Sequence, residues 1–261
     1  MESVLHQSFK DFEYIVVDGA STDDSLEMIH QYDASTVYQF HWISELDNGI
    51  YDAMNKGIGM TTGDYLLFLN SGDELVNFSV LEKSSELINS ATDICSGVLI
   101  MVEGDGDKRT VLAPVQELSL SYSMYGGLTH PNTFIRKSLF DKYGLYNKNN
   151  KIVSDWEFFL IAGGLHNLNY QAIFVPVSIF YMDGISSNPN NSLLVEEIKQ
   201  AITRNIPAPV LKDIERLRVL ENKMNQRNFK ILEWIKKYPV LDKFISAQFK
   251  LLFFILKRNN R

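Results

Sequence analysis

The sequence predicts an α/β fold in which short buried strands alternate with helices. The apolar runs Phe12–Val17 and Tyr65–Leu69 are too short for helices and are flanked by turn-forming residues, as strands buried on both faces are. Each run ends abruptly in polar residues, with Asp18 after the first and Asn70–Glu74 after the second. Because ligands bind beyond the carboxyl ends of strands in an open parallel sheet, both ends are candidate site positions.

Composition indicates a globular protein with room for one large domain, or for one domain and an appendage. The 261 residues are 45% hydrophobic and 22% charged. The single Cys95 excludes a disulfide framework and has no histidine at a zinc-binding spacing, so we expect a reducing compartment. The opening Met1–Val4 lacks the basic start and apolar core of a signal peptide.

The net charge of −7 is divided unevenly along the chain. From Lys212 onward, thirteen Lys and Arg stand against five Asp and Glu, a net charge of +8, whereas the first 211 residues carry −15. This asymmetry predicts a tail whose partner differs from that of the body. The acidic body argues against a nucleic-acid-binding protein.

Helices and strands alternate through the first ninety residues. After the end of a helix at residues 2–8, we expect the strand Phe12–Val17, a helix Ser25–Gln31, a strand Val37–Ser44, a helix Ile50–Met60, the strand Tyr65–Leu69 and a helix Ser79–Asn89. Helical spacing puts Ile50, Ala53, Met54 and Ile58 on the buried face of their helix, and Asp52, Asn55 and Lys56 on the other. Lys56 either meets a phosphate or is solvated.

Asp18 is a candidate for nucleotide binding. A carboxylate between a strand end and a helix start can accept a hydrogen bond from a nucleobase N–H or a ribose hydroxyl. The alternative role in this turn is helix capping, which accounts for Asp23 or Ser21 better than for Asp18.

The second half contains a hairpin, a polar loop and a short acidic helix start. The pattern predicts strands at 93–102, 108–113, 133–136 and 170–181, a loop at 126–132 and a helix at 137–143. Ser154 is placed to cap a further helix, which leaves Asp155 in the first turn with its carboxylate facing a cleft. The alternative is that Asp155 only interacts with the helix dipole.

From Ser192 onward the chain reads as helical, with breaks at residues 207–209 and at Pro239. The stretch Phe244–Arg258 is apolar with basic flanks, but it is too short to span a bilayer and contains Lys250. This pattern is typical of a helix lying in the plane of a membrane surface. The alternative is packing against the body or against a partner subunit.

Taken together, ordered blocks of the chain resemble glycosyltransferase family 2, whose members have the GT-A fold. The matching blocks are Phe9–Asp23, Asp47–Ile58, Gly63–Glu74, Thr129–Phe134, Ser154–Leu160 and Asp183–Ser186. The chain is most similar to members that build bacterial capsule, exopolysaccharide or O-antigen repeat units. The resemblance implies a GT-A nucleotide-sugar-binding domain at residues 1–190, with a mixed, mostly parallel central sheet flanked by helices, and a basic helical extension at residues 191–261.

The resemblance also implies an activity, namely inverting transfer of a sugar from a nucleotide-sugar to an acceptor hydroxyl, usually with Mg²⁺ or Mn²⁺ on the diphosphate. Asp155 matches the family's base, which takes the acceptor proton. Asp18 matches the acid that reads the nucleoside. The same blocks place Ser21, Asp47, Asn55 and Lys56 near the nucleotide, and His130, Trp156 and Glu157 near the sugar or acceptor.

Two features depart from the family pattern. The metal motif is usually Asp-X-Asp, whereas this window reads Asn70-Ser71-Gly72-Asp73. Asp73 would then hold the metal with Asn70 as a neutral ligand, and we expect weak metal affinity. Family members also begin with a central strand that precedes the start of this chain. We therefore expect a late start codon or a truncated gene, and an unstable or inactive product, since each orphaned backbone group costs about 1–3 kcal/mol.

Three functions fit these features to different degrees. The first is a glycosyltransferase of surface-polysaccharide assembly, cytoplasmic and peripheral at the inner face of the cytoplasmic membrane, with a lipid-linked acceptor. The second is a truncated, non-catalytic relative that binds nucleotide without turnover. The third, a sugar nucleotidyltransferase, would need a Gly-rich basic phosphate loop, which the sequence lacks.

Overall fold

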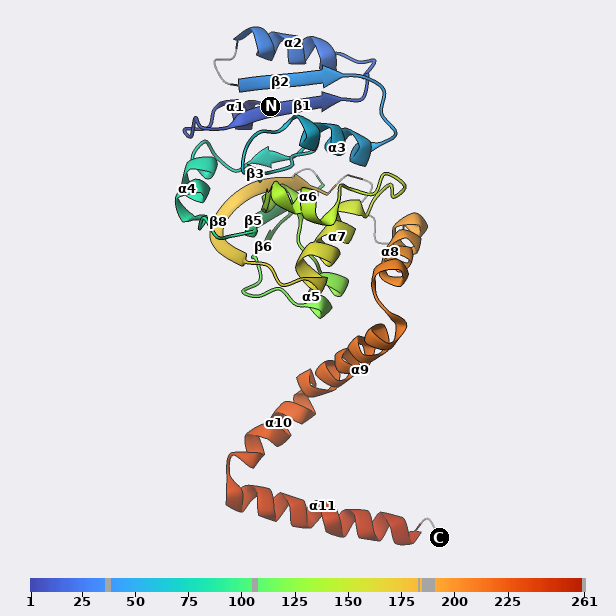
Figure 1. Cartoon of the computed structure of the whole chain (residues 1–261). Coiled ribbons are helices and arrows are strands. Elements are labelled where there is room, and N and C mark those ends of the chain that lie inside the picture. The colour runs from blue at the N-terminus through green and yellow to red at the C-terminus, as the bar shows by residue number, and fades with distance from the viewer. Residues whose placement is uncertain (36–38, 105–107, 183, 185–190, 260–261) are drawn as a thin grey trace. The chain divides into compact units, whose positions relative to one another are not determined.

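The computed structural model describes residues 1–35, 39–104, 108–182, 184 and 191–259 (Figure 1). Contacts divide the chain into two compact units, Met1–Asn205 and Ile206–Arg261, and each is described by itself. The first unit includes helix α8 (Ser192–Asn205), which the sequence analysis assigned to the extension.

The first unit contains two sheets. In the smaller, β1 (Glu13–Asp18) and β2 (Gln39–Ser44) run parallel, with Asp18 opposite Ser44 at their carboxyl ends. The larger sheet has the order β3-β7-β5-β8-β4, with β6 paired to β5. Its strands are β3 (Tyr65–Leu66), β4 (Glu74–Leu75), β5 (Ile94–Glu103), β6 (Lys108–Leu112), β7 (Thr133–Arg136) and β8 (Tyr170–Tyr181).

The predicted mixed α/β class is confirmed, but antiparallel pairs outnumber parallel ones among the described strands. Only β1–β2 and β5–β8 run parallel, whereas β3–β7, β4–β8, β5–β6 and β5–β7 are antiparallel. The expected predominance of parallel pairs is therefore wrong. The difference arises because β5 and β6 fold back as the predicted hairpin, and because β7 and β8 each pair antiparallel with a short strand.

The predicted strand Tyr65–Leu69 pairs only through its first two residues. It is nevertheless buried on two faces, since its side chains alternate between two core clusters. Leu66 and Phe68 pack in one cluster, and Tyr65, Leu67 and Leu69 pack against the other. This alternation is typical of an extended segment. The sequence pattern therefore predicted the extended conformation correctly, but it overestimated how many of these residues pair with another strand.

Helices flank the sheets. They are α1 (Glu2–Leu5), α2 (Ser25–Ser35), α3 (Ile50–Met60), α4 (Val80–Leu87), α5 (Leu120–Tyr125), α6 (Ser138–Tyr143) and α7 (Ser154–Phe159), together with the 3-10 turn η1 (His130–Asn132) and the π-helix η2 (Leu160–Leu165). The bounds of α3 are as predicted, but two side chains change faces. Ile50 is exposed and Asp52 is buried, because Asp52 accepts a hydrogen bond from the backbone N–H of Asn48 and Tyr51 enters the core instead.

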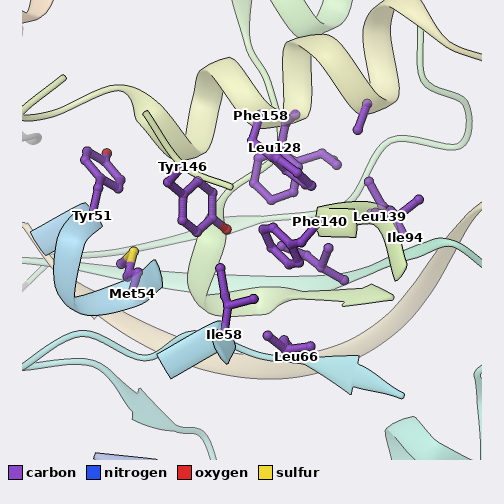
Figure 2. Close-up of a cluster of buried hydrophobic side chains, with 13 residues drawn as sticks. Tyr51, Met54, Ile58, Leu66, Ile94, Leu128, Leu139, Phe140, Tyr146 and Phe158 are labelled. Atoms are coloured by element: carbon purple, nitrogen blue, oxygen red, sulfur yellow. The ribbon is translucent and has the colours of Figure 1, made fainter. Parts of the chain in front are cut away.

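An aromatic cluster joins α3 to α7 (Figure 2). Tyr51 and Met54 of α3 lie in the same cluster as Tyr146, Phe140 and Phe158. The rings of Phe140 and Phe158 stack with centroids 4.5 Å apart, and Tyr146 meets Phe158 edge-on at 5.6 Å. Burying each such side chain stabilises the fold by about 1.5–3 kcal/mol, so the cluster fixes the start of α7 against α3.

The second unit consists of α9 (Ala208–Asn225), α10 (Arg227–Lys236) and α11 (Pro239–Asn259). The predicted breaks near Pro207 and at Pro239 are confirmed, and a further break falls at Gln226, whose backbone is extended. Within the described part of the chain, no helix is long and apolar enough to cross a membrane.

Candidate active site

Helix α7 carries Asp155 in its first turn. The predicted cap is wrong, because Val153 occupies the N-cap position and makes no side-chain cap bond. The hydroxyl of Ser154 is instead buried, with no hydrogen-bond partner among the described residues. The side chain of Asp155 remains 27% exposed, so its carboxylate is both near the core and reachable from solvent.

Side chains from two other elements surround the Asp155 carboxylate. The hydroxyl of Tyr51 lies 2.7 Å from Asp155 Oδ1, to which it donates. His130 Nδ1 lies 3.8 Å from Asp155 Oδ2, while His130 Nε2 is 2.7 Å from the hydroxyl of Tyr146. Phe68 stacks on the His130 ring at a centroid distance of 4.6 Å. The structure thus brings together the predicted residues His130 and Asp155, and adds two tyrosines.

Burial determines the charge of these neighbours. Desolvation lowers the pKa of His130, and the nearby Asp155 carboxylate opposes this only in part, so the imidazole is neutral near pH 7. Desolvation, followed by the charge of Asp155, raises the pKa of Tyr51 and of Tyr146. Both phenols therefore keep their protons, so the three ring side chains beside the Asp155 carboxylate are neutral near pH 7.

A second group of predicted residues gathers at the carboxyl ends of β1 and β2. Asp18 Oδ2 accepts hydrogen bonds from the N–H of Ser21 at 3.1 Å and the hydroxyl of Ser44 at 2.6 Å. Hydrogen bonds from Ser21 and then Ser44 lower the pKa of Asp18. Asp47 lies against Gly19, where an added Cβ would stand 2.6 Å from Asp47 Oδ2. Asp18, Ser21 and Asp47 thus form one acidic corner, in which a side chain at position 19 would displace the Asp47 carboxylate.

Asn55 and Lys56 are engaged with the protein itself. The amide of Asn55 pairs in both directions with the backbone of Tyr146, at 2.8 and 3.0 Å. Lys56 Nζ donates to the carbonyl of Leu46 at 2.9 Å and forms an ion pair with Glu45 at 2.9 Å. These contacts order the segments beside the acidic corner. The predicted contacts of both residues with nucleotide stay predictions.

The predicted metal residues lie in the turn after β3. Asp73 Oδ2 accepts the N–H of Asn70 at 2.9 Å, and the N–H of Asp73 returns a bond to the carbonyl of Asn70. Across the described residues, no group of three or more His, Cys, Asp or Glu is gathered closely enough to hold a metal ion. The turn therefore offers one carboxylate beside one amide, and a metal-binding role for them stays a prediction.

The two residues after Asp155 have different partners. Trp156 packs against Gly127 (φ +83°) in the loop before η1, where an added Cβ would be 2.9 Å from Trp156 Cδ1. Glu157 is buried and is bound by Arg204 at 2.7 and 2.8 Å, and also by Asn150 and Asn205. Glu157 therefore ties α7 to α8, a role that the sequence analysis missed. The predicted contact of either residue with sugar or acceptor stays a prediction.

The sequence analysis also missed Tyr51, Tyr146 and Glu197. Tyr51 was left out of the predicted buried face of α3, although its helical spacing from Met54 and Ile58 fits that face. Glu197 is buried on α8 and accepts the N–H groups of Lys151 and Ile152 at 2.6 and 2.9 Å. It thereby supports the loop that leads into α7.

The family model for "Glycosyl transferase family 2" matches residues 1–144, more than half of the chain. The chain belongs to this family. The acidic corner and the Asn70–Asp73 turn lie inside the matched segment, whereas Asp155 lies beyond it.

Two curated relatives of this family 2 protein are mycobacterial glycosyltransferases. A "PGL/p-HBAD biosynthesis glycosyltransferase" of Mycobacterium bovis (strain BCG / Pasteur 1173P2) is 29% identical over 161 residues, which is 60% of each chain. An "Uncharacterized glycosyltransferase" of Mycobacterium tuberculosis (strain ATCC 25618 / H37Rv) is 31% identical over 169 residues, or 62% of each chain. The chain thus spans about 60% of the length of these relatives.

Solved structures share the fold at low sequence identity. A fragment of S. aureus TarS in complex with UDP-GlcNAc matches with a TM-score of 0.59 and 18% identity, over 81% of this chain and 63% of that one. GalNAc-T7 with UDP, GalNAc and Mn²⁺ matches with a TM-score of 0.50 and 14% identity, over 73% and 41%. The predicted fold class is confirmed by these likenesses.

Proposed function

We propose that this family 2 protein is an inverting glycosyltransferase that moves a sugar from a nucleoside-diphosphate sugar to an acceptor hydroxyl. The observation that carries the proposal is the setting of Asp155, a partly exposed carboxylate held by Tyr51 beside the buried, neutral His130. Inversion needs one base, and a fixed carboxylate that reaches solvent suits that role. A non-catalytic relative would have no need for this arrangement.

Two carboxylates of the chain have separate roles in the proposed reaction. Asp155 takes the proton of the acceptor hydroxyl as the acceptor oxygen bonds to the anomeric carbon, and the bond from that carbon to the donor diphosphate breaks with its electron pair leaving on the diphosphate. Asp18, ionised and fixed by Ser21 and Ser44, accepts hydrogen bonds from the nucleoside. The UDP-GlcNAc bound to TarS and the UDP bound to GalNAc-T7 favour a UDP-linked donor.

A divalent cation, Mg²⁺ or Mn²⁺, belongs to the proposal. Asp73 and Asn70 fit such an ion, since Mg²⁺ is commonly held by one or two carboxylates together with substrate phosphates. The bound ion would neutralise charge on the departing diphosphate. The Mn²⁺ in the GalNAc-T7 structure supports this choice of ion.

The proposed acceptor is a lipid-linked glycan in capsule, exopolysaccharide or O-antigen assembly, at the inner face of the cytoplasmic membrane. Two observations support it. The curated relative from Mycobacterium bovis is described as a PGL/p-HBAD biosynthesis glycosyltransferase. The second unit exposes Trp234, Val240 and Phe244 in a region that carries excess positive charge.

The test combines nucleotide binding with turnover. Thermal unfolding of the full chain with UDP or GDP, in Mn²⁺ or in EDTA, should give a metal-dependent rise in melting temperature for one nucleotide. A panel of UDP- and GDP-sugars, each supplied with a bacterial lipid extract as the source of acceptor hydroxyls, should then show release of that nucleotide. Asp155→Asn should keep the rise in melting temperature and lose turnover by about 100-fold or more.

The matched control is Asp141→Asn, an exposed acid in the first turn of α6. It should behave as the wild type in both measurements. Wild-type turnover by Asp155→Asn would contradict the assignment of the base. A nucleotide-dependent shift without turnover of any sugar in the panel would contradict the enzymatic function and favour the non-catalytic relative.

A further inference from the structure

The hydroxyl of Tyr51 lies between two acceptors. It is 2.7 Å from Asp155 Oδ1 and 2.6 Å from the backbone carbonyl of Ile152. A neutral phenol has one proton, so it donates to only one of the two at a time. A bond to an ionised carboxylate is roughly twice as strong as a neutral one, so Asp155 is the preferred acceptor while it is charged.

Packing fixes the position of this hydroxyl. The Tyr51 side chain is 5% exposed, and its ring lies 5.8 Å from that of Tyr146 in the cluster that joins α3 to α7 (Figure 2). Ile152 is held from its other side, because Glu197 of α8 accepts its N–H at 2.9 Å. Both acceptors therefore stay within reach of the hydroxyl, and small movements of α7 are resisted.

We propose that Tyr51 is a positioning residue for Asp155, holding Oδ1 so that Oδ2 takes the proton of the acceptor hydroxyl. This inference rests on the proposed function. Before the reaction, the Tyr51 proton points to the charged carboxylate. When Asp155 has gained its proton, the Tyr51 proton turns to the carbonyl of Ile152, so the buried hydroxyl has an acceptor in both states.

The other groups around the carboxylate leave this role to Tyr51. The titratable groups facing Asp155 among the described residues are Tyr51 on α3, His130 on η1 and Tyr146 in the loop before α7. Tyr146 is bonded to His130 Nε2, and His130 Nδ1 is beyond hydrogen-bond distance of Oδ2. Among the described residues, Tyr51 is the side chain that donates a hydrogen bond to the Asp155 carboxylate.

The test uses Tyr51→Phe in the full chain, which keeps the buried ring and removes only the hydroxyl. The carboxyl signal of Asp155 is followed by ¹³C NMR of labelled aspartate at constant pH, with Asp155→Asn used to assign the signal. Because Tyr51 donates a hydrogen bond to that carboxylate, loss of the hydroxyl should change the carboxyl chemical shift. This readout needs no donor, and a tyrosine that only packs in the core would leave it unchanged.

Turnover is measured with the nucleotide-sugar that the wild type uses fastest in the panel of UDP- and GDP-sugars. We expect Tyr51→Phe to lower kcat about tenfold while the KM for the nucleotide-sugar stays as in the wild type. The control is Tyr143→Phe, a tyrosine packed against the same cluster without contact to Asp155. It should leave the carboxyl chemical shift and kcat unchanged.

The outcomes separate this inference from the proposed function. An unchanged carboxyl chemical shift of Asp155 in Tyr51→Phe overturns the positioning role, whatever the donor is. Loss of turnover in Asp155→Asn with a wild-type kcat in Tyr51→Phe also overturns it and leaves the base assignment intact. Full turnover in Asp155→Asn instead overturns the base, and the change in chemical shift then reports only the hydrogen bond.

Discussion

His130 couples the charge of the site to the stability of the fold. Burial lowers its pKa from 6.5, so the folded protein keeps a neutral imidazole where the unfolded chain gains a proton. Stability from this group is therefore present above about pH 6.5 and is lost as the pH falls below that value, by up to about 1.4 kcal/mol per pH unit. We expect the melting temperature to fall between pH 7.5 and 5.5, and to fall less in His130→Gln.

The measurement is thermal unfolding of both proteins across this range, and the control is His6→Gln, because His6 is exposed. The melting temperature of that control should fall with pH as steeply as that of the wild type. A His130→Gln variant with the full wild-type slope would show that His130 is not the group that gains a proton on unfolding.

For single residues, sequence patterns predict candidate carboxylates better than they predict which residues contact them. Asp18 and Asp155 are predicted because each follows a recognisable boundary, the end of a strand or the start of a helix, and their roles stay predictions. Tyr51 and Tyr146 were missed because the sequence does not distinguish a buried tyrosine beside a site from one that only packs in the core. Glu157 took an unforeseen partner because Arg204 lies 47 residues further along the chain. No local pattern links the two.

Among the elements, α8 supports the start of α7. Buried Glu197 accepts two backbone N–H groups of the preceding loop, and Arg204 binds Glu157. In Glu197→Ala both N–H groups lose their acceptor, at about 1–3 kcal/mol each. We expect a lower melting temperature and a loss of turnover, since the carbonyl of Ile152 and the Asp155 carboxylate shift with the loop.

Glu196→Ala is the matched control for this prediction. Glu196 is exposed on the same helix and, among the described residues, accepts a hydrogen bond from Gln200 one turn away, so its loss should change stability by about 0.5 kcal/mol or less. Chemical denaturation of the two variants gives the comparison. Equal stabilities would mean that α8 does not support the loop.

The bounds of several elements could be predicted, but their pairing could not. Helix α3 and strands β7 and β8 have the predicted bounds, because helical spacing and flanking turns are local signals. The excess of antiparallel pairs and the short ladder of β3 depend on which strands meet, and that is decided by long-range packing. Helix α8 joined the first unit for the same reason, through Glu157 and Glu197.

On the scale of the whole chain, charge and apolar exposure separate the two units. The last fifty residues carry +8, and the preceding 211 residues carry −15. In the second unit, Trp234, Tyr238, Val240, Leu241 and Phe244 line a shallow apolar hollow between α10 and α11. Lysines stand close by in the sequence at positions 236, 237 and 243. Aromatic and aliphatic side chains beside lysines match the chemistry of an anionic lipid surface.

This match leads to a prediction about vesicle binding. The full chain should sediment with vesicles that contain anionic lipid, and less so as salt rises, because each lysine near the surface contributes about 1 kcal/mol that salt screens. Val240 is 84% exposed and Phe244 is 62% exposed, so their apolar area is available for insertion. Deletion of residues 240–261 should release the protein, and Val240→Ser with Phe244→Ser should weaken binding at every salt concentration.

Val219→Ser, a substitution of a 53% exposed residue on α9, is the control and should bind as the wild type does. Unchanged sedimentation of the deletion variant would contradict membrane attachment through this unit, and equal binding to neutral vesicles would remove the role assigned to its charge.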